Sequence, residues 1–123
     1  MAIRILSVDD NALLREAIAA VIENQPDMVL VSQACSSSDA IVKHRALQPD
    51  VTLMDLRLPD ASGIDTMIAI RAEFPNARVI VLTTFENEAE NQRAMAAGAR
   101  GYLLKSMPPN ELIRAIRNAC AGN

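Results

Sequence analysis

Five short apolar runs alternate along the chain with five segments whose apolar residues recur at helical spacing. The runs are rich in β-branched and aliphatic residues and do not alternate with polar ones, a pattern typical of strands buried on both faces. Strands are expected at 3–8, 28–34, 51–55, 78–82 and 101–104, and helices at 12–23, 36–48, 63–73, 87–97 and 109–120. Crossovers of this length indicate one parallel sheet covered by helices on both faces. The chain is therefore predicted to be α/β, a doubly wound five-stranded sheet of order 2-1-3-4-5.

Composition limits the class of protein. The 123 residues are predicted to form one domain, residues 1–123, with 50% apolar and 22% charged residues. A net charge of −3 argues against nucleic-acid binding by this chain, which needs clustered Lys and Arg. No apolar run is as long as a membrane span, and the N-terminus carries no signal-peptide pattern. Cys35 and Cys120 are too far apart for a metal motif, and the prediction is a cytoplasmic protein without a disulfide.

The stretch 51–63 contains the most informative carboxylate. Asp55 ends an apolar run, and Pro59 and Gly63 then turn the chain. A charge is costly inside a strand buried on both faces, so Asp55 is expected at the carboxyl edge of the sheet. Open parallel sheets bind their ligands at that edge. For an isolated aspartate, a surface position that opens a turn is the alternative.

Polar residues also end the other strands. Asp9 and Asp10 follow the first strand, Thr83 ends the fourth, and Lys105 follows the fifth. The carboxyl ends of parallel strands lie along one edge, and the predicted order makes the first, third and fourth strands neighbours, with the fifth beside the fourth. We therefore expect these four residues and Asp55 to share one crevice.

The chemistry of this set points to magnesium and phosphate. Three carboxylates repel one another unless a cation is present. Oxygen ligands without His or Cys favour Mg²⁺ over zinc. Lys105 adds a positive charge and Thr83 a hydroxyl, so the set suits phosphoryl transfer to a carboxylate oxygen. The sequence offers no Ser-His or Cys-His pair and no Gly-rich phosphate loop.

Two residues that often carry chemistry are predicted here to serve in packing. His44, the single histidine, shares the apolar face of the helix at 36–48, and Cys120 lies on the inner face of the last helix. The helix at 87–97 has few apolar anchors and ends at Gly98, so it is expected to be the most mobile.

Four motifs resemble those of the receiver domain of two-component response regulators. They are V-D-D at 8–10, M-D-L-R-L-P-x-x-S-G at 54–63, V-L-T-T at 81–84 and G-Y-L-L-K at 101–105. The resemblance covers essentially the whole chain. The sequence from 82 onward is similar to the NarL/FixJ (LuxR-type) branch, whose receivers usually precede a helix-turn-helix DNA-binding domain.

The resemblance implies a role for each residue of the crevice. Asp55 would accept a phosphoryl group from a phosphohistidine on a sensor histidine kinase. Asp10, Asp55 and the backbone carbonyl of Arg57 would hold Mg²⁺, and Asp9 would position a metal-bound water. Lys105 would pair with the phosphoryl group.

The resemblance also implies a conformational switch. The Thr83 hydroxyl would move to the phosphoryl group while the Tyr102 ring turns inward. The protein would be no enzyme in the usual sense, but a phosphoacceptor that promotes its own phosphorylation and dephosphorylation. It would form a homodimer on phosphorylation and reach DNA only through a C-terminal domain absent from this chain. The dimer surface is expected on the first and last helices, or on the fourth helix, fifth strand and fifth helix.

Three features depart from the family pattern. Ser106 follows the lysine where many receivers have a cis proline, so the Lys105–Ser106 bond is expected to be trans, or cis under strain. Pro108 stands where a capping serine is common, so the last helix is expected to lack a side-chain cap. Thr84 and Arg57 are bulky neighbours of the acceptor and are predicted to slow the approach of water.

Other functions are compatible with the same sequence. A flavodoxin-like fold binds FMN at the same edge, although acidic residues there repel its phosphate. The chain could also serve as a phosphorylation-independent dimerisation module or as a stand-alone receiver. An excised receiver, cut where a linker begins at 121–123, is the expected arrangement.

Overall fold

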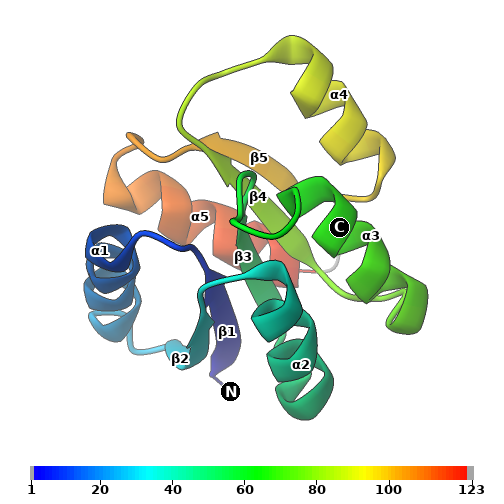
Figure 1. The fold of residues 1–123 in the computed structure, drawn as a ribbon. Coiled ribbons are helices and arrows are strands. Elements are labelled where there is room, and N and C mark those ends of the chain that lie inside the picture. The colour runs from blue at the N-terminus through cyan, green and yellow to red at the C-terminus, as the bar shows by residue number, and fades with distance from the viewer. Residues whose placement is uncertain (1, 122–123) are drawn as a thin grey trace.

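The computed structural model describes residues 2–121 and places five parallel strands in one sheet of order β2-β1-β3-β4-β5 (Figure 1). The strands are β1 (Ile3–Val8), β2 (Met28–Ala34), β3 (Val51–Asp55), β4 (Val79–Thr83) and β5 (Gly101–Leu104). The helices are α1 (Ala12–Glu23), α2 (Ser37–Leu47), α3 (Gly63–Glu73), α4 (Glu88–Ala96) and α5 (Pro109–Cys120). The predicted fold class and strand order are confirmed. Met1 and residues 122–123, where the linker is expected, lie outside the described residues.

Two apolar layers sandwich the sheet. One layer joins α1 and α5 to the sheet through residues such as Ile18, Leu53 and Ile116. The other joins α2, α3 and α4 through residues such as Met54, Met67 and Ala94. Every residue of β3 and β4 is buried, because successive side chains of these central strands point into opposite layers. This explains why the central strands show no polar alternation in the sequence.

Four of the helices begin directly after a residue whose side chain caps the helix N-terminus. Asn11, Ser36, Ser62 and Asn87 cap the first four helices by accepting hydrogen bonds from backbone N–H groups. Pro108 precedes α5 and makes no side-chain cap, as predicted. The α2 helix ends one residue before the predicted position because Gln48 adopts a positive φ of 44°.

The weakest attachment is that of α4, the yellow helix at the rim of Figure 1. Ala94 is its one buried residue, and Met95 is 48% exposed. Gly98 follows the helix with a φ of +103°, and a Cβ there would lie 2.6 Å from Arg71 Nε. The sequence prediction of few apolar anchors is therefore confirmed, and α4 has little apolar contact to resist displacement.

His44 on α2 and Cys120 at the end of α5 lie away from the sheet edge that carries the carboxylates, whereas Cys35 follows β2 at that edge. The His44 ring is buried and packs against Phe74, with 5.1 Å between ring centroids. Cys35 and Cys120 are both free thiols. Burial raises the pKa of the Cys120 thiol, which packs against the layer of α1 and α5. His44 and Cys120 are thus packing residues, as expected. Within residues 2–121, no helix has the length and apolar character needed to cross a membrane.

Candidate phosphoacceptor site

The register of the sheet brings the strand ends together. Val8 pairs with Met54, so the next residues along both strands, Asp9 and Asp55, are neighbours. Asp55 in turn pairs with Leu82, the residue before Thr83. Likewise Thr83 pairs with Leu104, the residue before Lys105. A hollow of about 240 Å³ opens at this edge. Its lining residues are Asp10, Asn11, Asp55, Leu56, Arg57, Thr83, Thr84 and Lys105.

Three carboxylates meet at this edge. One oxygen from each of Asp9, Asp10 and Asp55 lies within 4.8 Å of the others. Asp9 and Asp55 are buried, at 1% and 4% exposure, whereas Asp10 is exposed. Such a cluster of hard oxygen ligands, open to solvent on one side, suits a divalent cation that keeps some of its waters. The predicted convergence of the carboxylates is present in the structure.

Lys105 lies between the two buried carboxylates. Its Nζ is 3.0 Å from Asp55 Oδ1 and 3.1 Å from Asp9 Oδ2. Burial lowers the pKa of the Lys105 ammonium, but its contacts with Asp55 and Asp9 outweigh burial, so its pKa is raised. Burial also raises the pKa of Asp55, and the repulsion from Asp9 adds to it, while the hydrogen bond from Lys105 works in the opposite direction. The ammonium therefore stays charged, and it favours the ionised form of Asp55 against the effect of burial.

Backbone groups fix the position of Asp55. The Arg57 N–H donates to Asp55 Oδ1 at 3.2 Å, and the Leu56 N–H donates to the Leu82 carbonyl at 3.0 Å. Gly63 packs directly on this strand end, where a Cβ would lie 2.1 Å from the Asp55 carbonyl oxygen. The turn of 56–63 therefore needs glycine at position 63 because its backbone approaches β3 too closely for any side chain.

Thr83 and Tyr102 both bind the loop between β4 and α4. The buried Thr83 hydroxyl donates to the Phe85 carbonyl at 3.1 Å, and the Tyr102 hydroxyl donates to the Asn87 carbonyl at 3.4 Å. Asn87 is also the N-cap of α4. Both hydroxyls thus hold the loop that leads into α4.

The comparison with known families agrees with this geometry. The family model described as the response regulator receiver domain matches residues 5–117. The chain belongs to the response regulator receiver domain family.

The relatives of this receiver domain include a transcriptional regulatory protein and a response regulator. It is 42% identical over 120 residues to the uncharacterized transcriptional regulatory protein YxjL of Bacillus subtilis, covering 98% of this chain and 55% of the relative. It is 34% identical over 122 residues to the response regulator protein VraR of Staphylococcus epidermidis, covering 99% of this chain and 58% of the relative. The receiver domain thus spans little more than half the length of these relatives.

Solved structures of the same type superimpose closely. A two-component response regulator of the LuxR family from Aurantimonas has a TM-score of 0.96 at 36% identity, covering 100% of this chain and 88% of the other. The receiver domain of the putative response regulator NarL from Mycobacterium tuberculosis has a TM-score of 0.94 at 27% identity, covering 99% and 98% of the two chains. The resemblance seen in the sequence is therefore confirmed in fold and in branch.

Several residues of the receiver's site have no signal in the sequence. The Arg15 guanidinium donates to the Asp9 carbonyl at 2.6 Å, and the Asn11 N–H donates to Asp9 Oδ1 at 2.8 Å. Asp60 accepts hydrogen bonds from the N–H groups of Ser37 and Ser38, which lower the pKa of its carboxyl. Asn11 also caps α1 through its side chain. The Arg15 and Asp60 contacts join residues that no local pattern relates.

The departure from the family pattern at Ser106 leaves the backbone regular. Residues 2–121 contain no cis peptide bond, so the Lys105–Ser106 bond of this receiver is trans. The Lys105 N–H donates to the Thr83 carbonyl at 2.8 Å, which continues the β4–β5 pairing up to the site.

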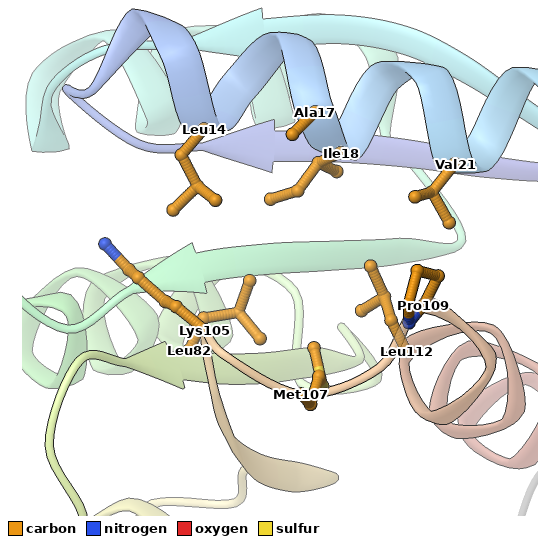
Figure 2. Close-up of a pocket in the computed structure, with 9 residues that line it drawn as sticks. All are labelled: Leu14, Ala17, Ile18, Val21, Leu82, Lys105, Met107, Pro109 and Leu112. Atoms are coloured by element: carbon orange, nitrogen blue, oxygen red, sulfur yellow. The ribbon is translucent and has the colours of Figure 1, made fainter.

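An apolar groove of about 130 Å³ lies beside the site, between α1 and the β5–α5 connection. Figure 2 shows Leu14, Ile18 and Val21 of α1 facing Met107 and Leu112 across it. The stem of Lys105 closes one end of the groove, and its ammonium points away from the apolar side chains. Lys105 therefore lines both the groove and the hollow of the carboxylates.

Proposed function

We propose that this receiver domain is a phospho-accepting switch in which Asp55 takes a phosphoryl group from a sensor histidine kinase. The observation that carries the proposal is the meeting of Asp9, Asp10 and Asp55 within 4.8 Å, with the Lys105 ammonium 3.0 Å from Asp55. In-line phosphoryl transfer needs a positioned oxygen nucleophile and positive charge around the moving group.

We propose Mg²⁺ as the cofactor. Asp10, Asp55 and the backbone carbonyl of Arg57 would bind it, with Asp9 acting through a metal-bound water. The donor set fits, since it contains only carboxylate and carbonyl oxygens and Asp10 leaves one side open to solvent. When bound, the cation would neutralise the charge that gathers on the transferred group.

In the transfer step, an oxygen of the ionised Asp55 carboxylate attacks phosphorus. The bond between phosphorus and the phosphohistidine nitrogen breaks, and the imidazole nitrogen keeps the electron pair and takes up a proton. The product is an acyl phosphate on Asp55. Lys105 already contacts Asp55 Oδ1 and would face a phosphoryl oxygen in the product. Dephosphorylation is the attack of water on the same phosphorus, which returns the carboxylate and inorganic phosphate.

The switch would follow from the new acceptor oxygens. A phosphoryl group brings about −1.5 to −2 charges and three acceptor oxygens. The Thr83 hydroxyl, now bound to the Phe85 carbonyl, would turn to one of these oxygens. The β4–α4 loop would lose that bond, and the Tyr102 ring would turn inward as the loop moves. Only one of the two arrangements contains the new bond, so phosphorylation shifts their populations.

The phosphohistidine domain of the kinase would dock on the groove of Figure 2. Leu13 precedes the groove residue Leu14 in α1 and is 77% exposed, so an apolar partner surface would find contacts at this end of α1. Lys105 lines both the groove and the acceptor hollow, so a partner seated in the groove would bring its phosphoryl group to Asp55.

The output would be transcriptional. The relatives extend well beyond the length of this chain, which supports a C-terminal helix-turn-helix DNA-binding domain in a longer cytoplasmic regulator. Phosphorylation would favour a homodimer of the receiver. A stand-alone receiver remains the alternative arrangement.

Incubation with acetyl phosphate and Mg²⁺ tests the proposal. The expected result is one added phosphate per chain by intact-mass spectrometry, with none on Asp55→Asn. The matched control is Asp65→Asn, which removes a carboxylate from the first turn of α3 and should leave labelling unchanged. Full labelling of Asp55→Asn would contradict the proposed acceptor.

A further inference from the structure

We propose that Arg57 exchanges partners when the receiver is phosphorylated: it holds Glu90 of α4 before the reaction and binds the phosphoryl group on Asp55 afterwards. This inference rests on the proposed function and adds to it a direct electrostatic link between the acceptor and α4. The link is separate from the Thr83 and Tyr102 contacts described above.

Arg57 lies where two hollows of the surface meet. It lines the hollow of about 240 Å³ that contains Asp55 and Lys105. It also lines a larger hollow of about 450 Å³ between the β3–α3 turn and α4, together with Asp65, Glu90 and Arg93. Arg57 therefore borders both the acceptor and the face of α4.

The present partner of Arg57 is Glu90. Arg57 Nη2 lies 3.7 Å from Glu90 Oε2, while the Arg57 side chain is 76% exposed and that of Glu90 18% exposed. The Glu90 carboxylate is thus largely buried, and the Arg57 guanidinium is largely exposed to solvent. An ion pair this long and exposed contributes little and is easily exchanged. It nevertheless spans the gap to α4, whose one buried residue is Ala94.

The competing partner would appear next to the Arg57 backbone. The Arg57 N–H already contacts Asp55 Oδ1 at 3.2 Å, so a phosphoryl group on Asp55 lies within reach of the side chain of residue 57. Such a group carries more charge than the Glu90 carboxylate and offers three oxygens to a guanidinium, which binds phosphate with two parallel hydrogen bonds. The exchange therefore favours the phosphoryl group, and α4 loses the contact with Glu90.

The test measures affinity for beryllofluoride, a non-covalent mimic of the phosphoryl group, by calorimetric titration in Mg²⁺. Glu90→Gln frees Arg57 beforehand and is expected to raise the affinity about two- to fivefold, the range of one exposed ion pair. Arg57→Gln keeps the backbone carbonyl and is expected to lower the affinity by a similar factor or more. In the Arg57→Gln background, Glu90→Gln is expected to have no effect. Asp65→Asn removes a carboxylate from the same hollow and is the matched control.

Hydrogen exchange of the α4 amides without beryllofluoride gives a second readout. Arg57→Gln and Glu90→Gln should each speed this exchange about two- to fivefold, and the double variant should add nothing further. Equal effects of Glu90→Gln in both backgrounds, or no effect in either, would contradict the exchange of partners while leaving the proposed function standing. Failure of the unsubstituted protein to bind beryllofluoride would contradict the proposed function and, with it, the exchange.

Discussion

At the scale of single residues, the ammonium of Lys105 balances two buried carboxylates. It lies 3.0 Å from Asp55 Oδ1 and 3.1 Å from Asp9 Oδ2. We predict that Lys105→Gln lowers the rate of labelling by acetyl phosphate about a hundredfold, the typical effect of removing one donor that stabilises a developing charge. Lys43→Gln is the control, since Lys43 pairs with Asp39 on α2. An unchanged rate in Lys105→Gln would contradict the role given to this ammonium.

His44 gives the receiver a dependence of stability on pH. Burial lowers the pKa of the imidazole below 6.5, although the negative charge of Glu73 opposes the shift. Neither ring nitrogen has a hydrogen-bond partner among residues 2–121. Folding therefore favours the neutral ring. Its contribution is complete above pH 6.5 and is lost as the pH falls toward the folded pKa, because the unfolded chain takes up the proton first.

Urea unfolding of the unsubstituted protein and of His44→Gln over this pH range provides the test. We predict that the free energy of unfolding of the unsubstituted protein falls more steeply below pH 6.5 than that of the variant. The difference in slope can reach about 1.4 kcal/mol per pH unit, the value for one proton. Parallel pH profiles would show that the ring titrates alike in both states.

At the scale of elements, the turn between β3 and α3 depends on Gly63. A Cβ at this position would lie 2.1 Å from the Asp55 carbonyl oxygen, so Gly63→Ala must displace the turn. We predict a loss of about 1–3 kcal/mol in the free energy of unfolding, as for other overpacked sites, together with slower labelling of Asp55. Gly101→Ala is the control, because its Cβ would lie an ordinary 3.5 Å from Ile80 Cγ2. Equal stability of the two variants would contradict the close approach.

The bounds of the helices and strands could be predicted from local sequence patterns. The meeting of the polar residues at the strand ends could be predicted as well. Apolar runs, capping residues such as Asn11 and Ser36, and the polar residue at each strand end are all visible in the chain. The sheet order then brings the strand ends together without further information. The site carboxylates and Lys105 were found in this way.

No sequence pattern predicts the contacts that long or exposed side chains make between distant parts of the chain. Arg15 reaches the Asp9 carbonyl, Asp60 caps α2, and Arg57 meets Glu90. Each depends on the side-chain conformation of one residue and on the path of a loop, which periodicity does not encode. These contacts are therefore visible only in the folded structure.

At the scale of the whole molecule, the sheet provides a rigid base and α4 the part that can respond. The central strands are buried throughout, whereas α4 is held by Ala94, by the Tyr102–Asn87 hydrogen bond and by the Arg57–Glu90 pair. A charge added at Asp55 would act on both polar contacts. Phosphorylation would thus act on α4, the helix with one buried residue, and leave the core unchanged.

The central claim is that side chains from 9 to 105 form one magnesium-dependent phosphoacceptor site. A crystal structure of the protein with Mg²⁺ and beryllofluoride tests it most directly. We predict Mg²⁺ bound by Asp10, Asp55 and the Arg57 carbonyl, with beryllofluoride on Asp55 and within hydrogen-bond distance of Thr83 and Lys105. Beryllofluoride or Mg²⁺ bound elsewhere, with Lys105 still paired only to Asp9 and Asp55, would contradict the account.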